Sequence, residues 1–93
     1  MEREFLNSLR EPFIQLFEQG MAPPDIARAT NHGLEAVDRY LKDYGRVKVL
    51  VGKRLTLSEI SQAIGRGLST VEQYYKLVLN YHPELSDAVQ EGS

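Results

Sequence analysis

The stretch that decides the fold runs from Leu55 to Val78 and reads LTLSEISQAIGRGLSTVEQYYKLV. Thr56 and Glu59 have the spacing of a capping box, in which the Thr hydroxyl accepts from the Glu N–H and the Glu carboxylate accepts from the Thr N–H. The apolar residues that follow recur at steps of three and four, as on one face of a helix: Leu57, Ile60, Ala63 and Ile64. Gly65 predicts the end of this helix, because a residue without a Cβ adopts the left-handed conformation at low cost.

A second helix is predicted after a short turn of Gly65, Arg66 and Gly67. Ser69 and Glu72 have the spacing of a second capping box at its start. Its predicted apolar stripe consists of Leu68, Val71, Tyr74 or Tyr75, and Val78. A short helix, a turn containing glycine and a longer helix form the geometry that places the second helix in the DNA major groove. The stretch therefore predicts a helix-turn-helix unit.

This unit resembles the helix-turn-helix families of bacterial regulators, resolvases and sigma factors. The residues that carry the resemblance are Leu57, Glu59, Ile60, Gly65, Ser69, Thr70 and Val71. Two residues depart from the family pattern: Ser61 replaces the usual alanine, and Arg66 stands where the turn usually holds an apolar residue. The resemblance implies that the second helix binds DNA.

Residues 21–44 repeat residues 55–78 at an offset of 34 positions without a gap. Six positions are identical and lie on the predicted stripe or in the turn: Ile26 and Ile60, Ala29 and Ala63, Gly33 and Gly67, Leu34 and Leu68, Val37 and Val71, and Tyr40 and Tyr74. Two repeats whose helices pack in the same way would retain the residues at such positions. We therefore predict a first helix-turn-helix unit in residues 21–51, with Asn31 in the left-handed role of Gly65. Over residues 20–80 the tandem arrangement resembles an uncharacterised prokaryotic family of double helix-turn-helix proteins, which implies sequence-dependent DNA binding.

The second helix of the first unit is expected to run from Leu34 to Val51 and to stop at Gly52, because Val37, Leu41, Tyr44 and Val51 keep the helical period. The alternation around Val47 leaves an extended segment as the alternative.

The other regions complete an all-α domain of 93 residues, 42% of them apolar. Residues 1–19 are expected to form a helix or a helix pair, with Pro12 in the first turn of the second helix. Its three Phe residues are expected in the core, with a dimerisation face as the alternative: Phe5, Phe13 and Phe17. The second helix-turn-helix unit occupies residues 55–80. Pro83 interrupts its last helix, so residues 83–93 are predicted to form a short helix and a tail.

Composition and motif spacing exclude several classes of function. The chain has no Cys, which excludes disulfides and thiolate metal sites and leads us to expect a cytoplasmic protein. No segment approaches the roughly 18 apolar residues of a membrane span, so we expect no membrane partner. His32 and His82 stand far apart in the chain, and no nucleophile is paired with a base. We therefore expect no enzyme activity, no cofactor and no metal.

Positive charge collects between residues 39 and 54, where Asp43 is the only acidic residue. With the polar residues at the start of the last helix, this segment predicts a surface for double-stranded DNA. The candidate residues are Arg39, Lys42, Arg46, Lys53, Arg54, Arg66, Ser69, Thr70, Gln73 and Lys76. The first unit has Glu35 and Ala36 at the start of its second helix, so the second unit is the better candidate reader.

The net charge of −2 is unusual for a DNA-binding domain. The alternative is therefore a module for protein interaction or dimerisation on the same scaffold, with a second copy or another protein as its partner.

Overall fold

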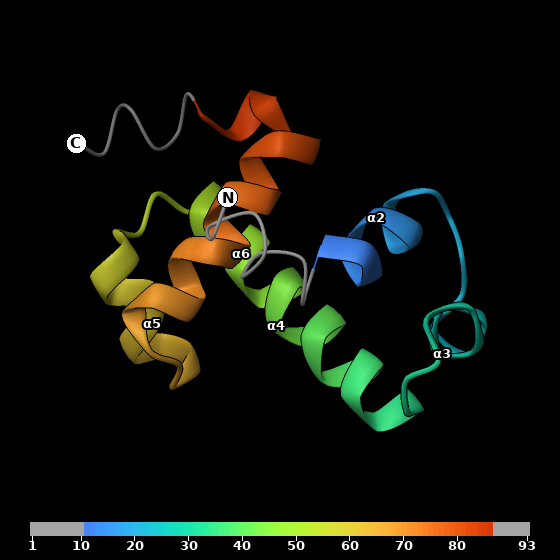
Figure 1. Ribbon diagram of the computed structural model, residues 1–93. Coiled ribbons are helices and arrows are strands. Elements are labelled where there is room, and N and C mark those ends of the chain that lie inside the picture. The colour runs from blue at the N-terminus through green and yellow to red at the C-terminus, as the bar shows by residue number, and fades with distance from the viewer. Residues whose placement is uncertain (1–10, 87–93) are drawn as a thin grey trace, which may run out of the picture. The chain divides into compact units, whose positions relative to one another are not determined.

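The computed structural model describes residues 11–86, and over this range the chain is all-helical (Figure 1). The elements are α2 (Glu11–Glu18), α3 (Pro23–Thr30), α4 (Leu34–Gly52), α5 (Leu57–Ile64), α6 (Leu68–Tyr81) and the 3-10 helix η1 (Pro83–Leu85). The predicted all-α class is confirmed, and the extended alternative around Val47 is wrong because α4 continues through it. The predictions for residues 1–10, Phe5 included, and for residues 87–93 lie outside the described residues.

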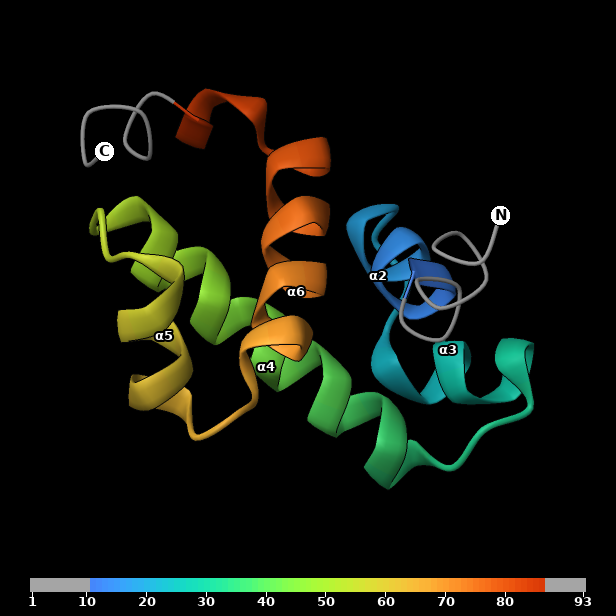
Figure 2. The same ribbon diagram turned by 60° about the vertical axis from the view of Figure 1, so that its left-hand side comes forward.

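The chain divides into two compact units, with the boundary inside α4 between Lys42 and Asp43. In the first unit α2 packs against α3, and the first part of α4 follows. In the second unit the remainder of α4 is followed by α5 and α6, which pack against each other (Figure 2). Each unit therefore contains one helix and then two helices joined by a short turn.

The backbone repeats at the offset of 34 residues that the sequence shows. Both ends of α3 and α5 are separated by this offset, and so are the starts of α4 and α6. The left-handed residues form two pairs at the same offset: Gly20 with Arg54, and Asn31 with Gly65. The repeat also includes one more helix than the sequence indicates, because α2 and α4 end 34 positions apart, at Glu18 and Gly52. Thus α4 serves as the last helix of the first unit and the first helix of the second.

Each unit buries its own set of apolar side chains. In the first unit these are Phe13, Ile14, Ile26, Ala27, Val37 and Leu41. In the second unit they are Tyr44, Val47, Val51, Ile60, Val71, Tyr74, Leu77 and Val78. Of the two tyrosines that the stripe of α6 left open, Tyr74 is the buried one and Tyr75 is half-buried.

Five residues predicted on the apolar side of their helices are exposed: Phe17, Ala29, Leu34, Ala63 and Leu68. Leu34 and Leu68 are the first residues of α4 and α6, and they precede the first buried residue of each helix. In α5 the side that packs inward is centred between Ile60 and Ile64. Ala63 lies outside that side of the helix, so it is exposed.

The two predicted capping boxes have different outcomes. At the start of α5, the Thr56 N–H donates to Glu59 Oε1 at 2.8 Å, and the Glu59 N–H donates to Thr56 Oγ1 at 3.1 Å. The second box is wrong, because α6 begins at Leu68 with Gly67 as an N-cap that has no side-chain bond. Ser69 is therefore the second residue of the helix and lies exposed in its first turn.

Four helices end with the same backbone pattern, the Schellman motif. A left-handed residue follows the helix, and the N–H of the next residue donates to a carbonyl five positions back. These donor and acceptor pairs, with N···O distances of 3.0 to 3.3 Å, are Met21 and Leu16, His32 and Ala27, Leu55 and Leu50, and Arg66 and Ser61. The left-handed roles of Asn31 and Gly65 are confirmed, whereas that of Arg54 was not predicted.

Candidate nucleic-acid interface

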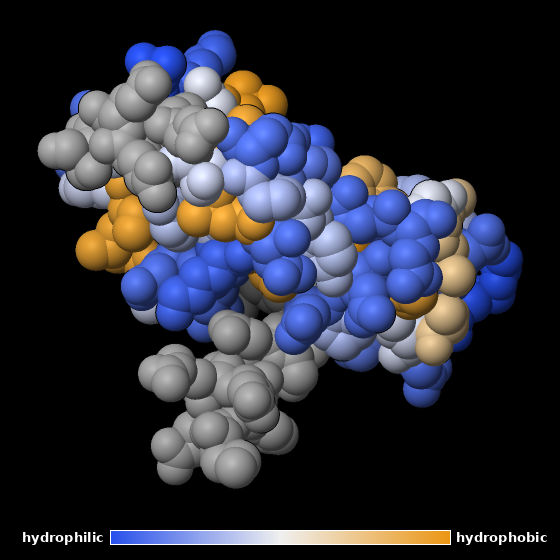
Figure 3. Space-filling model, turned by 90° about the horizontal axis from the view of Figure 1, so that it is seen from above, coloured by the Kyte–Doolittle hydropathy of each residue, from blue (hydrophilic) through white to orange (hydrophobic). Residues whose placement is uncertain are grey.

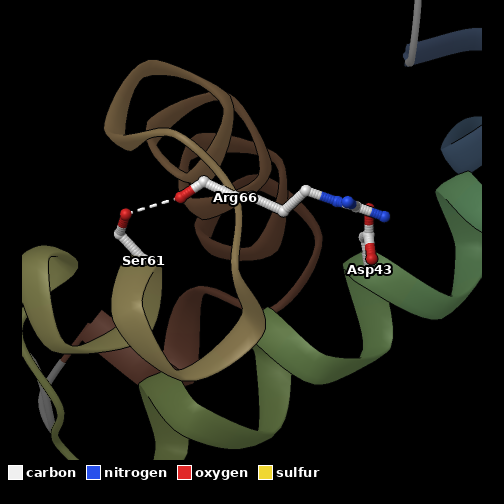
Figure 4. A network of polar contacts seen from close by, with 3 residues as sticks. All are labelled: Asp43, Ser61 and Arg66. Carbon is white, nitrogen blue, oxygen red and sulfur yellow. Dashed lines mark hydrogen bonds and ion pairs between the residues drawn. The ribbon is translucent and has the colours of Figure 1, made fainter.

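The turn between α5 and α6 is tied to α4 by a short chain of polar contacts (Figure 4). Arg66 Nε donates to Asp43 Oδ2 at 2.8 Å, and Ser61 Oγ donates to the backbone oxygen of Arg66 at 2.5 Å. The Asp43 side chain is only 6% exposed, whereas that of Arg66 is 40% exposed. The two departures from the helix-turn-helix pattern, Ser61 and Arg66, are thus direct partners in the structure.

The electrostatics of this contact favour a fixed cation. The hydrogen bond to Asp43, and then the charge of Asp43, raise the pKa of Arg66 above its ordinary value, with a smaller contribution from Tyr74. Arginine is cationic at physiological pH in any case, so the contact fixes the position of the guanidinium rather than its protonation. Sequence reasoning made Arg66 a candidate DNA contact and gave Asp43 no role. The sequence feature that could have indicated a role for Asp43 is that it is the only acidic residue in the basic segment between residues 39 and 54.

The outer side of α6 combines different chemical groups. Its exposed residues begin with Leu68, which is 54% exposed, and fall on one side of the helix: Leu68, Ser69, Glu72, Lys76 and Asn80. The buried residues Val71, Tyr74 and Val78 hold the opposite side. Thr70 and Gln73, two other candidates, are half-buried between these sides. The helix therefore presents a hydroxyl, a carboxylate, an amine and an amide to solvent.

The remaining basic candidates lie on α4 and in the connection that follows it. Arg39 and Lys42 are exposed on the part of α4 that belongs to the first unit, and Arg46 is exposed on the part that belongs to the second. Lys53 and Arg54 are exposed in the connection to α5.

Charge is divided unequally between the units. The second unit, residues 43–93, contains six Lys and Arg against six Asp and Glu, whereas the first unit, residues 1–42, contains five against seven. The second unit is therefore neutral, and the first unit carries the net charge of −2. The acidic excess of the chain therefore lies outside the unit that carries α6.

The first unit has different chemistry at the equivalent turn. The His32 ring, at the position of Arg66, meets the Phe13 ring edge-on with centroids 5.0 Å apart. Phe13 in turn stacks on Tyr40 at 5.1 Å. Glu35 and Asp38 are exposed on the following helix, and their carboxylates would repel phosphate. The candidate interface is therefore built on the second unit.

These features define an all-α protein built from two repeats of a three-helix unit. The chain belongs to the family described as "Protein of unknown function (DUF1670)", whose model matches residues 8–77. The search of curated proteins finds no match, and no solved structure matches. Between residues 11 and 86 no helix is long and apolar enough to cross a membrane. Over the same range no cluster of three or more His, Cys, Asp or Glu is placed to hold a metal ion.

Proposed function

We propose that the chain is a DNA-binding protein of the helix-turn-helix type, acting as a transcriptional regulator or a mobile-element-associated protein. The observation that supports this function best is the exposed side of α6, which begins directly after a short glycine-containing turn. A three-helix unit whose last helix enters the major groove is an established arrangement for reading DNA. The basic segment between residues 39 and 54 adds the phosphate contacts that such a protein needs.

The candidate residues have distinct roles in this proposal. Ser69, in the first exposed turn of α6, donates to a base edge or a phosphate, and Lys76 binds a phosphate further along the helix. Arg46, Lys53 and Arg54 provide phosphate contacts from α4 and the connection after it. Gln73 has the amide that pairs with adenine. Glu72 lies on the same side as Lys76 and limits the affinity by repelling phosphate.

The proposal is tested by titrating a mixed-sequence duplex of about 25 bp with the protein at about 50 and 200 mM salt, using fluorescence anisotropy. Lys76→Ala should weaken binding and reduce the slope of log K against log salt by about one, because one phosphate contact is lost. Arg28→Ala is the matched control, since Arg28 is also exposed and cationic but lies on α3 of the first unit. Absence of binding by the wild-type protein at both salt concentrations, or equal losses in the two variants, contradicts the proposal.

Exposed apolar side chains favour a second candidate function, an interaction or dimerisation module. On the face shown in Figure 3 several hydrophobic areas interrupt a largely hydrophilic surface. The large exposed hydrophobic residues are Phe17, Leu34, Val49 and Leu68. Phe13, which the sequence offered for such a patch, is 2% exposed and cannot contribute to it.

This second candidate is tested by light scattering across a range of protein concentrations. A mass that rises with concentration, and that Phe17→Ser and Leu34→Ser restore to the monomer value, supports it. A constant monomer mass together with salt-sensitive DNA binding excludes dimerisation and favours the DNA-binding proposal.

A further inference from the structure

We infer that Arg66 is a positioning residue, whose ion pair with Asp43 fixes the turn before α6, and not a phosphate ligand. This inference rests on the proposed function of α6 and specifies how its first turn is held in place. It also revises the role that the sequence suggested for Arg66.

The first argument comes from the helix ends. Schellman motifs commonly include a hydrophobic contact between the two residues that the long backbone bond joins. Two of the four motifs here join apolar residues, Leu16 with Met21 and Leu50 with Leu55. After α5 the joined residues are Ser61 and Arg66, and a side-chain hydrogen bond links them. A polar contact therefore replaces the usual apolar one at the turn that leads into α6.

The second argument comes from the equivalent turn of the first unit. There His32 contacts Phe13, a residue of the preceding helix α2. In the second unit Arg66 contacts Asp43, a residue of the preceding helix α4. The same backbone position thus anchors the turn to the preceding helix in both units, once through a ring contact and once through an ion pair.

The third argument is the burial of Asp43. Its side chain is 6% exposed, so water has little access to the carboxylate. A buried charge that loses its partner is strongly destabilising, whereas an exposed ion pair contributes little. Moving Arg66 from Asp43 to a phosphate would therefore lose more than it gains.

The position of Arg66 in the chain explains how the contact acts on α6. Gly67, the next residue, is the N-cap of α6 and has no side-chain bond to the helix. The contacts of Arg66 are therefore the nearest restraint in sequence before Leu68 and Ser69. Loss of either partner should loosen the exposed first turn that the proposed function uses.

The first test measures amide hydrogen exchange in Arg66→Gln and Asp43→Asn without DNA. We expect exchange at residues 71–74, the first amides of α6 that donate within the helix, to become at least about tenfold faster in both variants, relative to the amides of the first unit in the same sample. Asp43→Leu/Arg66→Met should restore slow exchange, because an apolar pair can replace a buried ion pair. Unchanged exchange in both single variants overturns the inference.

The second test measures the salt dependence of binding to the mixed-sequence 25 bp duplex. The slope for Arg66→Gln should equal that of Arg28→Gln, whereas Lys76→Ala reduces the slope by about one. A drop of about one in Arg66→Gln, together with tighter binding by Asp43→Asn, would show that Arg66 binds phosphate and overturns the inference. If the wild-type protein does not bind the duplex, the proposed function fails, and the exchange measurement alone decides the positioning role.

Discussion

At the scale of single residues, two glycines of the second unit should respond to substitution by alanine with opposite changes in stability. Gly65 has a φ of 72°, which L side chains rarely adopt, although a Cβ there would meet no atom within 4 Å. Gly45 lies inside α4 with ordinary helical φ, and a Cβ there would also meet nothing within 4 Å. The cost of a side chain at Gly65 therefore comes from the backbone alone, and Gly45 carries only the entropic penalty of glycine in a helix.

We expect Gly65→Ala to lower the free energy of unfolding by about 1–2 kcal/mol. Gly45→Ala should raise it by about 0.5–1 kcal/mol, because alanine loses less backbone entropy in a helix. Urea unfolding followed by circular dichroism measures both changes. A destabilising Gly45→Ala would show that α4 needs a glycine for a reason other than its conformation.

At the scale of elements, the two helices of the second unit begin in different ways. The first turn of α5 is closed by the reciprocal bonds of Thr56 and Glu59. The first turn of α6 begins at Gly67 without such bonds, and Ser69 in that turn is exposed. The start of α5 is therefore a source of stability, whereas the exposed start of α6 is the part that the proposed function uses.

Substitution of the hydroxyl residues at the two helix starts separates these roles. Thr56→Ala should lower the free energy of unfolding by about 1 kcal/mol, since it removes an N-cap bond. Ser69→Ala should change it by less than about 0.5 kcal/mol and instead weaken binding to the duplex. Thermal unfolding and anisotropy on the same samples provide the comparison. A large stability loss in Ser69→Ala would contradict the exposed position of this residue.

At the scale of the whole molecule, α4 belongs to both repeats, because the boundary between the units falls within it. Val37 and Leu41 are buried in the first unit, and Val47 and Val51 in the second. Since helix formation is cooperative along the chain, the two halves of α4 should stabilise each other. We therefore expect both units to unfold in one transition.

The buried Ile26 and Ile60 occupy equivalent positions in the two repeats and provide the test. Ile26→Ala and Ile60→Ala should each shift one common urea transition, by about 2–5 kcal/mol. Circular dichroism and tyrosine fluorescence should give coincident curves in both variants. Two separate transitions, with each substitution moving only one, would show that the units fold independently.

The sequence by itself determined the features that depend on neighbouring residues. The capping box at Thr56, the left-handed positions of Asn31 and Gly65 and the course of α4 all follow from local spacing and backbone preference. The internal repeat was also visible, because equivalent helices retain similar residues.

Only the tertiary structure decided which side chains those helices bury and which partners they find. Arg66 pairs with Asp43, 23 residues earlier, and no local pattern predicts that contact. Tyr74 is buried rather than Tyr75, and Leu68 is exposed, because packing against the other helices selects the inward side within an apolar stripe that allows either. The physical reason is range: caps and turns act over a few residues, whereas burial and ion pairs depend on segments that meet only in the folded chain.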